Sequence, residues 1–88
     1  MAVSKMSVLP TVTKYVEKTG VSVAANDIST VTMNVSDAVY QIIKGFSIFG
    51  AANIVIMQCY FASPTSIQMR CRNVSSSSQT FSVFVNYC

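Results

Sequence analysis

Apolar and polar residues alternate along several short stretches of this chain. Residues 30–35, 66–74 and 80–88 carry apolar side chains at every second position. A period of two residues is typical of β-strands that have one buried and one exposed face. The faces expected to be buried consist of Val31, Met33, Val35, Ile67, Met69, Cys71, Phe81, Val83, Val85 and Tyr87.

Turn residues separate these stretches from further candidate strands. Residues 21–23 are a short β-branched run before the turn cluster at 24–27, and residues 53–61 are apolar on both faces. Residues 40–49 also favour a strand, although a helical turn competes over residues 37–44. About six or seven strands, with turns every 8–12 residues or so, predict an all-β fold. We expect a small antiparallel β-sandwich of the jelly-roll, immunoglobulin-like or lectin-like type.

The N-terminal part of the chain differs from the rest. Residues 11–17 alternate and are rich in β-branched side chains, which indicates an extended strand or arm. We therefore predict an N-terminal arm over residues 1–19 and a sandwich domain over residues 20–88. The first ten residues are either a frayed terminus or an arm that becomes ordered on a neighbouring subunit. In the second case the anchoring side chains are Val3, Met6, Val8 and Leu9.

A hairpin between residues 53–61 and 66–74 would decide which apolar side chains face outward. A turn over residues 62–65 places Cys59 opposite Gln68 and Cys71 opposite Ile56. A shift of one residue in this loop would change both pairs. The two cysteines then lie on opposite faces, where no disulfide forms. The expected core is Ile54, Ile56, Tyr60, Ile67, Met69 and Cys71. The expected interface is Val55, Met57, Cys59 and Phe61, with Phe84 on the second face of the last strand.

The composition supports contacts between subunits. The chain has 88 residues, of which 51% are hydrophobic and 10% charged, whereas soluble domains contain about 25% charged residues. A domain of this size buries only roughly 60–65% of its unfolded surface. We therefore predict a homo-oligomer, with a trimer favoured, in which the excess apolar surface is covered.

The side-chain inventory disfavours catalysis and cofactor binding. The sequence contains no histidine and three carboxylates, Glu17, Asp27 and Asp37, whereas acid–base catalysis relies on such groups with shifted pKa values. Its three cysteines are isolated and one short of a cysteine-only zinc site. We expect no enzyme activity, no metal and no cofactor, with free thiols in a reducing compartment.

Charge and hydropathy also disfavour nucleic acid and membrane partners. The net charge of +3 is spread along the chain, whereas nucleic-acid binders show clustered Lys and Arg. Arg70 and Arg72 alone share a face, and they are more simply explained as solubilising residues on an exposed strand. The longest apolar segment, residues 46–61, is too short and interrupted to span a membrane. No secretory signal is expected over residues 1–10.

Four segments together resemble a known group of domains. These are an A-N turn that ends residues 20–26, the alternating residues 31–35, the pattern Y-x-x-I-x-G at residues 40–45, and R-x-R-N-x-S-S-S within residues 67–81. The chain resembles the small β-sandwich domains of tailed-bacteriophage virion proteins, of the head-fibre, decoration or tail-fibre-tip type, and more distantly the H-type lectins. The resemblance implies a hairpin turn at Asn73 and residues 75–78.

The resemblance and the composition together define two hypotheses for function. The first is a virion structural protein, synthesised in the host cytoplasm, which attaches to a capsid or tail through its arm; a capsid decoration or head-fibre role is favoured over a tail-fibre or baseplate role. The second is a module that binds a host-surface glycan through polar loops. The candidate loop residues are Asn26, Asp27, Asn53, Ser75 and Ser76.

Overall fold

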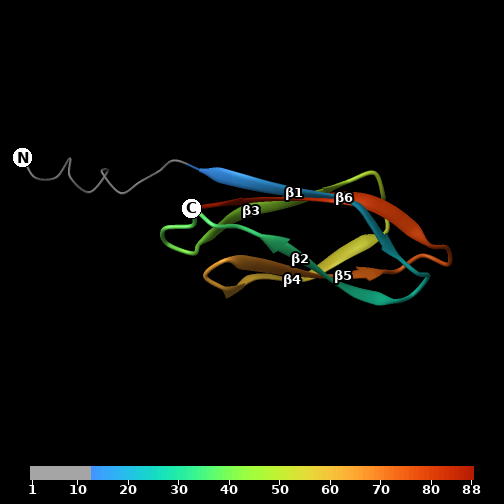
Figure 1. Ribbon diagram of the computed structural model, residues 1–88. Helices are drawn as coiled ribbons and strands as arrows, with labels where there is room; N and C mark the ends of the chain where they lie inside the picture. Colours follow the sequence, from blue (N-terminus) through green and yellow to red (C-terminus); the bar gives the residue numbers. More distant parts are fainter. Residues whose placement is uncertain (1–12) are drawn as a thin grey trace, which may run out of the picture.

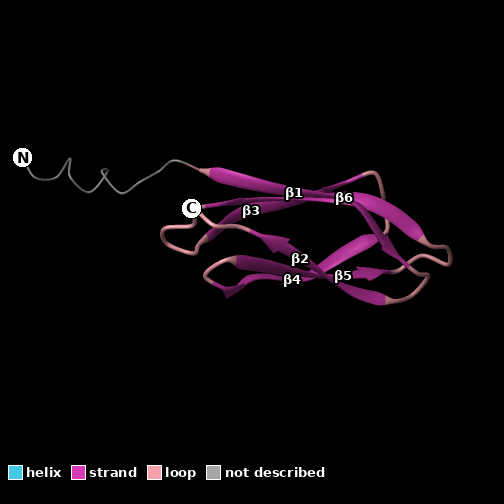
Figure 2. Cartoon of the chain, in the orientation of Figure 1, coloured by secondary structure: helices cyan, strands magenta, loops and turns pink. Residues whose placement is uncertain are grey.

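The computed structural model describes residues 13–88, and within this range every regular element is a β-strand (Figures 1 and 2). The predicted anchoring residues Val3, Met6, Val8 and Leu9 lie outside the described residues. The strands are β1 (Lys14–Val23), β2 (Ile28–Asn34), β3 (Ile43–Phe49), β4 (Ile54–Ser63), β5 (Ser66–Asn73) and β6 (Gln79–Tyr87). The prediction of an all-β fold is confirmed.

The six described strands form two antiparallel sheets of three strands each, in the orders β1-β6-β3 and β2-β5-β4. Consecutive strands pair only in the β4–β5 hairpin, and every other connection passes from one sheet to the other. The last two strands, β5 and β6, are therefore the central strands of the two sheets. The four remaining strands are all edge strands, which matters for the exposed surface described below.

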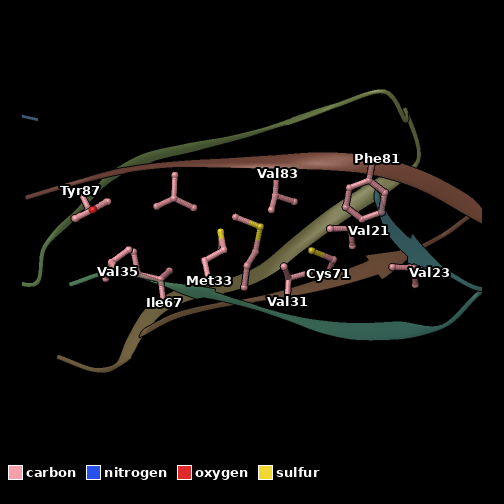
Figure 3. Packing of buried hydrophobic residues seen from close by; sticks show 12 residues of the cluster. Val21, Val23, Val31, Met33, Val35, Ile67, Cys71, Phe81, Val83 and Tyr87 are labelled. Carbon is pink, nitrogen blue, oxygen red and sulfur yellow. The ribbon is translucent and has the colours of Figure 1, made fainter. Parts of the chain in front are cut away.

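The core lies between the two sheets, where side chains of both layers meet (Figure 3). On β5 and β6 every second residue is buried, as the alternating pattern predicts. Ile67, Met69, Cys71, Val83 and Val85 are completely inaccessible to solvent. The ten side chains that the alternation in residues 30–35, 66–74 and 80–88 assigned to buried faces are all buried.

Strand β1 extends further toward the N-terminus than predicted. Lys14–Lys18, which the pattern assigned to the arm, pair with residues 83–87 of β6. An extra residue between Lys18 and Val21 shifts the register, and Gly20 adopts a φ of 67° there. Glycine tolerates this left-handed conformation because it has no Cβ. This part of the predicted arm therefore belongs to the sheet. The competing helical turn over residues 37–44 does not form.

The predicted register of the β4–β5 hairpin holds for one half of β4 and is wrong for the other. Cys71 lies opposite Ile56 as predicted, but Cys59 lies opposite Met69 and not Gln68. The reason is a β-bulge between Ile56 and Gln58, where Met57 is an additional residue on β4. One extra residue reverses the face of every side chain that follows.

The bulge changes which side chains of β4 reach the core. Cys59 and Phe61 pack against the buried cluster, so the prediction that they face outward is wrong. Tyr60, predicted to be buried, is 39% exposed, and its hydroxyl donates a hydrogen bond of 2.8 Å to Gln68 Oε1 on the outer face. Cys59 and Cys71 lie on the same face, and both thiols are free.

Candidate interaction surface

The structure brings the three predicted ligand loops together at one end of the fold. The backbone N–H of Asn26 donates to Ser75 O at 3.2 Å, which joins the β1–β2 turn to the β5–β6 loop. The N–H of Val74 donates to Asn53 O at 3.0 Å, which joins the β3–β4 loop to the same point. Residues far apart in the sequence thus meet at one end of the fold, opposite the end where β1 begins (Figure 1).

A buried asparagine that the sequence reasoning treated only as a turn residue holds this end together. The side chain of Asn73 is completely inaccessible to solvent. Its Nδ2 donates to Val23 O at 3.0 Å and to Ser77 O at 2.8 Å, and its Oδ1 accepts from Ser75 N at 2.9 Å and Ser75 Oγ at 2.7 Å. Buried polar groups are stable only when they are hydrogen-bonded, and here both the amide donor and the acceptor are used.

The polar groups of these loops bond mainly to one another. Ser75 Oγ lies 2.7 Å from both Asn73 Oδ1 and Ser77 O, so its single hydroxyl proton is shared between these two acceptors. Gln79 Nε2 donates to Ser75 Oγ at 3.2 Å. Asp27 Oδ1 accepts from the N–H of Ile28 at 2.8 Å. These bonds are typical of Asx and serine turns. The loop end is therefore first of all a structural junction.

The opposite end carries a small charged network. The hydroxyl of the buried Tyr87 donates to Asp37 Oδ1 at 2.5 Å, and Lys14 Nζ lies 3.6 Å from Asp37 Oδ2. The hydrogen bond from Tyr87 and the nearby Lys14 ammonium lower the pKa of the Asp37 carboxyl. Burial and the same hydrogen bond raise the pKa of Tyr87 to about 12. The network links the start of β1 to the loop between β2 and β3.

The predicted interface residues are divided between the core and the surface. Val55 and Met57 are 48% and 45% exposed on the outer face of β4, whereas Cys59 and Phe61 point inward. Phe84 lies on the outer face of β6, as predicted, and is half-buried. The structure therefore separates Phe84 from Val55 and Met57, because they belong to different sheets.

An aromatic cluster that the sequence reasoning missed surrounds Phe84. The ring of Tyr15 stacks on Phe84 with centroids 5.0 Å apart, and Phe49 approaches edge-on at 6.4 Å. Tyr15 and Phe49 are 66% and 56% exposed. The cluster requires β1, β6 and β3 to be neighbours, so a pattern along one strand does not reveal it.

The side of the fold formed by β3 and β4 has no charged residue over a long stretch. Residues 45–69 contain no Asp, Glu, Lys or Arg, and they include most of β3, all of β4 and the first part of β5. Both β3 and β4 are edge strands. Exposed apolar side chains on these two strands are Phe46, Phe49, Val55, Met57 and Tyr60. They do not form one patch, because Phe49 lies beside Phe84 on the outer face of one sheet, whereas Val55 and Tyr60 lie on the outer face of the other. The missing charge is readable in the sequence.

The basic residues on the other sheet form no larger patch. Arg70 and Arg72 project from the outer face of central strand β5, where Arg70 lies between Thr30 and Gln58, and Arg72 between Ile28 and Val55. None of these four neighbours is basic.

The described residues provide little catalytic or metal-binding chemistry. Within residues 13–88, no group of three or more His, Cys, Asp or Glu side chains is placed to hold a metal ion. Burial raises the pKa of the Cys59 and Cys71 thiols, which keeps them in the less reactive protonated form.

Comparisons with known proteins add no relative. In the part of the chain that the structure describes, no helix is long and apolar enough to cross a membrane. Searches against protein-family models, curated proteins and solved structures found no match to this chain. The features of the molecule that bear on its function are therefore the exposed apolar strands, the aromatic cluster and the loop end.

Proposed function

We propose that this protein is a non-catalytic structural protein whose two sheets form a β-sandwich that assembles with copies of itself. One observation carries the proposal: edge strands β3 and β4 expose apolar side chains on a side of the molecule that has no charge over residues 45–69. Natural proteins protect exposed edge strands with charged residues, especially lysine. An uncharged edge with exposed phenylalanine side chains is therefore suited to contact with another copy of the chain.

We further propose that the assembly belongs to a bacteriophage virion, as a capsid decoration or head-fibre protein. The support is the resemblance of residues 20–26, 31–35, 40–45 and 67–81 to virion sandwich domains. The polarity of the fold is compatible with this role, because β1 begins at one end and the loop junction lies at the other (Figure 1). Residues 1–12, which precede β1, would attach to the particle, and the loop end would project from it.

Two measurements test this proposal. Sedimentation equilibrium of the purified full chain is expected to give a multiple of the 9.5 kDa monomer mass; a monomer at all concentrations would refute assembly. Quantitative mass spectrometry of virus particles purified from the source culture is expected to find the chain in many copies per particle. Its absence from such particles would refute the virion role while leaving self-assembly intact.

A host-glycan module is the second candidate, because the structure brings Asn26, Asn53 and Ser75 together at one end. Convergent polar loops are a common setting for ligand sites. Binding of the full chain to a glycan array, followed by loss of binding in Asn53→Ala, would support this function. The absence of any glycan ligand would leave the loop end with its structural role.

A further inference from the structure

Three of the four edge strands carry a feature that blocks pairing with another chain. Strand β1 has Lys14, Glu17 and Lys18 and an irregular register near Gly20. On β2, Thr32 O accepts a hydrogen bond of 3.2 Å from Lys18 Nζ. Strand β4 has register shifts at two places. Charges and bulges of this kind keep sheet edges from pairing with other chains.

Strand β3 has a register shift between Ile43 and Gly45, but it lacks such protection from Gly45 to Phe49. From Gly45 to Phe49 it pairs with β6 without any register shift, and these residues are uncharged. Its one charged residue, Lys44, donates a hydrogen bond of 3.2 Å to Thr13 Oγ1. Thr13 precedes β1, on the far side of β6, so this lysine reaches away from the free edge. The backbone of residues 45–49 therefore remains open to a further strand.

Gly45 directly follows the register shift that begins at Ile43, and glycine often marks such a bulge. Its backbone does not adopt a positive φ, and a Cβ added to it would meet no atom within 4 Å. Glycine weakens a strand interior, and it often marks a place where another group approaches closely. An aromatic side chain from a neighbouring strand packs well over such a glycine. The open space around Gly45 therefore leaves room for a side chain from a further strand.

We propose that β3 pairs antiparallel with β3 of a second copy, about a two-fold axis at Ser47. In this register Ser47 faces Ser47 of the second copy, and Phe49 faces Gly45 of the second copy on the outer face. Phe46 faces Ile48 of the second copy on the inner face. Phe49 thus packs over a glycine, and Phe46 packs against an apolar side chain. Because the paired residues are uncharged, two identical strands can pair without charge repulsion. The two copies then share one sheet of six strands.

The exposed surface is consistent with a modest but specific interface. Phe46 and Phe49 are 47% and 56% exposed. Since a fully buried aromatic side chain contributes about 150–250 Å², the two leave roughly 200 Å² to be covered in each copy. Together with one strand edge, this gives an interface below the roughly 1,200 Å² at which stable interfaces begin, in the size range of weak, transient contacts. We therefore expect a dimer that forms reversibly.

This inference rests on the proposed self-assembly and makes it more specific. An antiparallel pair of identical strands has two-fold symmetry, so it produces a dimer and not the trimer favoured by the sequence. The symmetry also places the same residue of both copies side by side at the axis. A charge introduced at Ser47 would therefore face an identical charge.

The test is a charge exchange at the axis. Sedimentation equilibrium over roughly 1 µM to 1 mM would compare the wild type, Ser47→Lys, Ser47→Glu and an equal mixture of the two variants. Each variant alone is expected to dimerise at least about tenfold more weakly, because like charges directly opposite each other repel. The mixture is expected to restore the dimer. Ser22 is the matched control, since it is an exposed serine on β1, the other edge of the same sheet.

A second measurement does not depend on charge. Paired residues on antiparallel strands have Cα atoms about 4.5–5.5 Å apart, which a disulfide spans. In a Cys88→Ser background, Ser47→Cys is therefore expected to form a disulfide-linked dimer under mild oxidation, and Ser22→Cys is not.

The outcomes separate this inference from the proposed function. If the wild type assembles and both Ser47 charge variants assemble equally well, the interface lies elsewhere and only the β3 pairing is overturned. A wild-type trimer also overturns the two-fold pairing. A wild type that stays monomeric at every concentration overturns both the pairing and the proposed self-assembly.

Discussion

The replacement Asn73→Ala removes four hydrogen bonds that join three segments of the fold. The carbonyl oxygen of Val23 would lose its buried hydrogen bond from Asn73. Leaving a buried polar group without a hydrogen-bond partner costs about 1–3 kcal/mol. The three other bonds are partly exposed and contribute about 0.5–1.5 kcal/mol each. We therefore expect a loss of roughly 2.5–7.5 kcal/mol. A domain of this size has a total stability of only roughly 4–13 kcal/mol.

Guanidinium-induced unfolding followed by far-ultraviolet circular dichroism measures this loss. The melting temperature should also fall, by at least about 10 °C, because each kcal/mol corresponds to roughly 4–8 °C in a small domain. Asn34→Ala is the matched control, since Asn34 is an exposed asparagine on β2, and it should change the stability by less than about 0.5 kcal/mol. If Asn73→Ala were as stable as Asn34→Ala, Asn73 would not hold the loop end together.

Four further measurements test other parts of the structure. The lowered pKa of Asp37 stabilises the folded state above about pH 4, and this contribution is lost as the pH falls through the folded pKa. For Tyr87 the pKa is raised to about 12, so the free energy of unfolding should decrease as the pH rises from about 10, the unfolded value, to about 12. Gly50 has a φ of 96°, so Gly50→Ala should cost roughly 1–2 kcal/mol in denaturant unfolding. Cys71 is completely inaccessible to solvent, so mass spectrometry after iodoacetamide treatment should find it unmodified in the folded protein.

Each of these predictions has its own control. Asp37→Asn should flatten the acid side of the stability curve, and an unchanged acid side would contradict the role of this carboxyl. Tyr87→Phe should likewise flatten the alkaline side of the stability curve. Gly45→Ala should not share the cost of Gly50→Ala, because Gly45 has an ordinary backbone conformation and open space around it. Labelling of Cys71 as fast as in guanidinium would show that the core is open.

The alternation of apolar and polar residues was sufficient to predict the strands that are regular and have one buried face. The limits predicted for three strands, residues 30–35, 66–74 and 80–88, differ by one or two residues from those of β2, β5 and β6. These strands pack against the core on one side only, so apolar side chains recur at every second position. The same reasoning found the outward position of Phe84 and the exposure of Val55 and Met57.

The apolar pattern did not predict which side chains face inward where one extra residue in a strand changed the register. Residues 53–61 are apolar on both faces, so nothing in their sequence distinguishes the inward from the outward side chains. The bulge at Met57 turned Cys59 and Phe61 into the core and Tyr60 to the surface. A bulge depends on how two strands fit together, and this is a property of the pair and not of either strand alone.

The amino-acid sequence by itself determined the strands, the buried faces of β2, β5 and β6, and the long charge-free stretch, because each follows from neighbouring residues along one segment. The tertiary structure decided which strands became edges, which side chains of β4 turned inward, and why Asn73 is buried. These features arise from contacts between segments distant in sequence. The exposed edge of β3 is among them, since a strand is an edge only with respect to the strands around it.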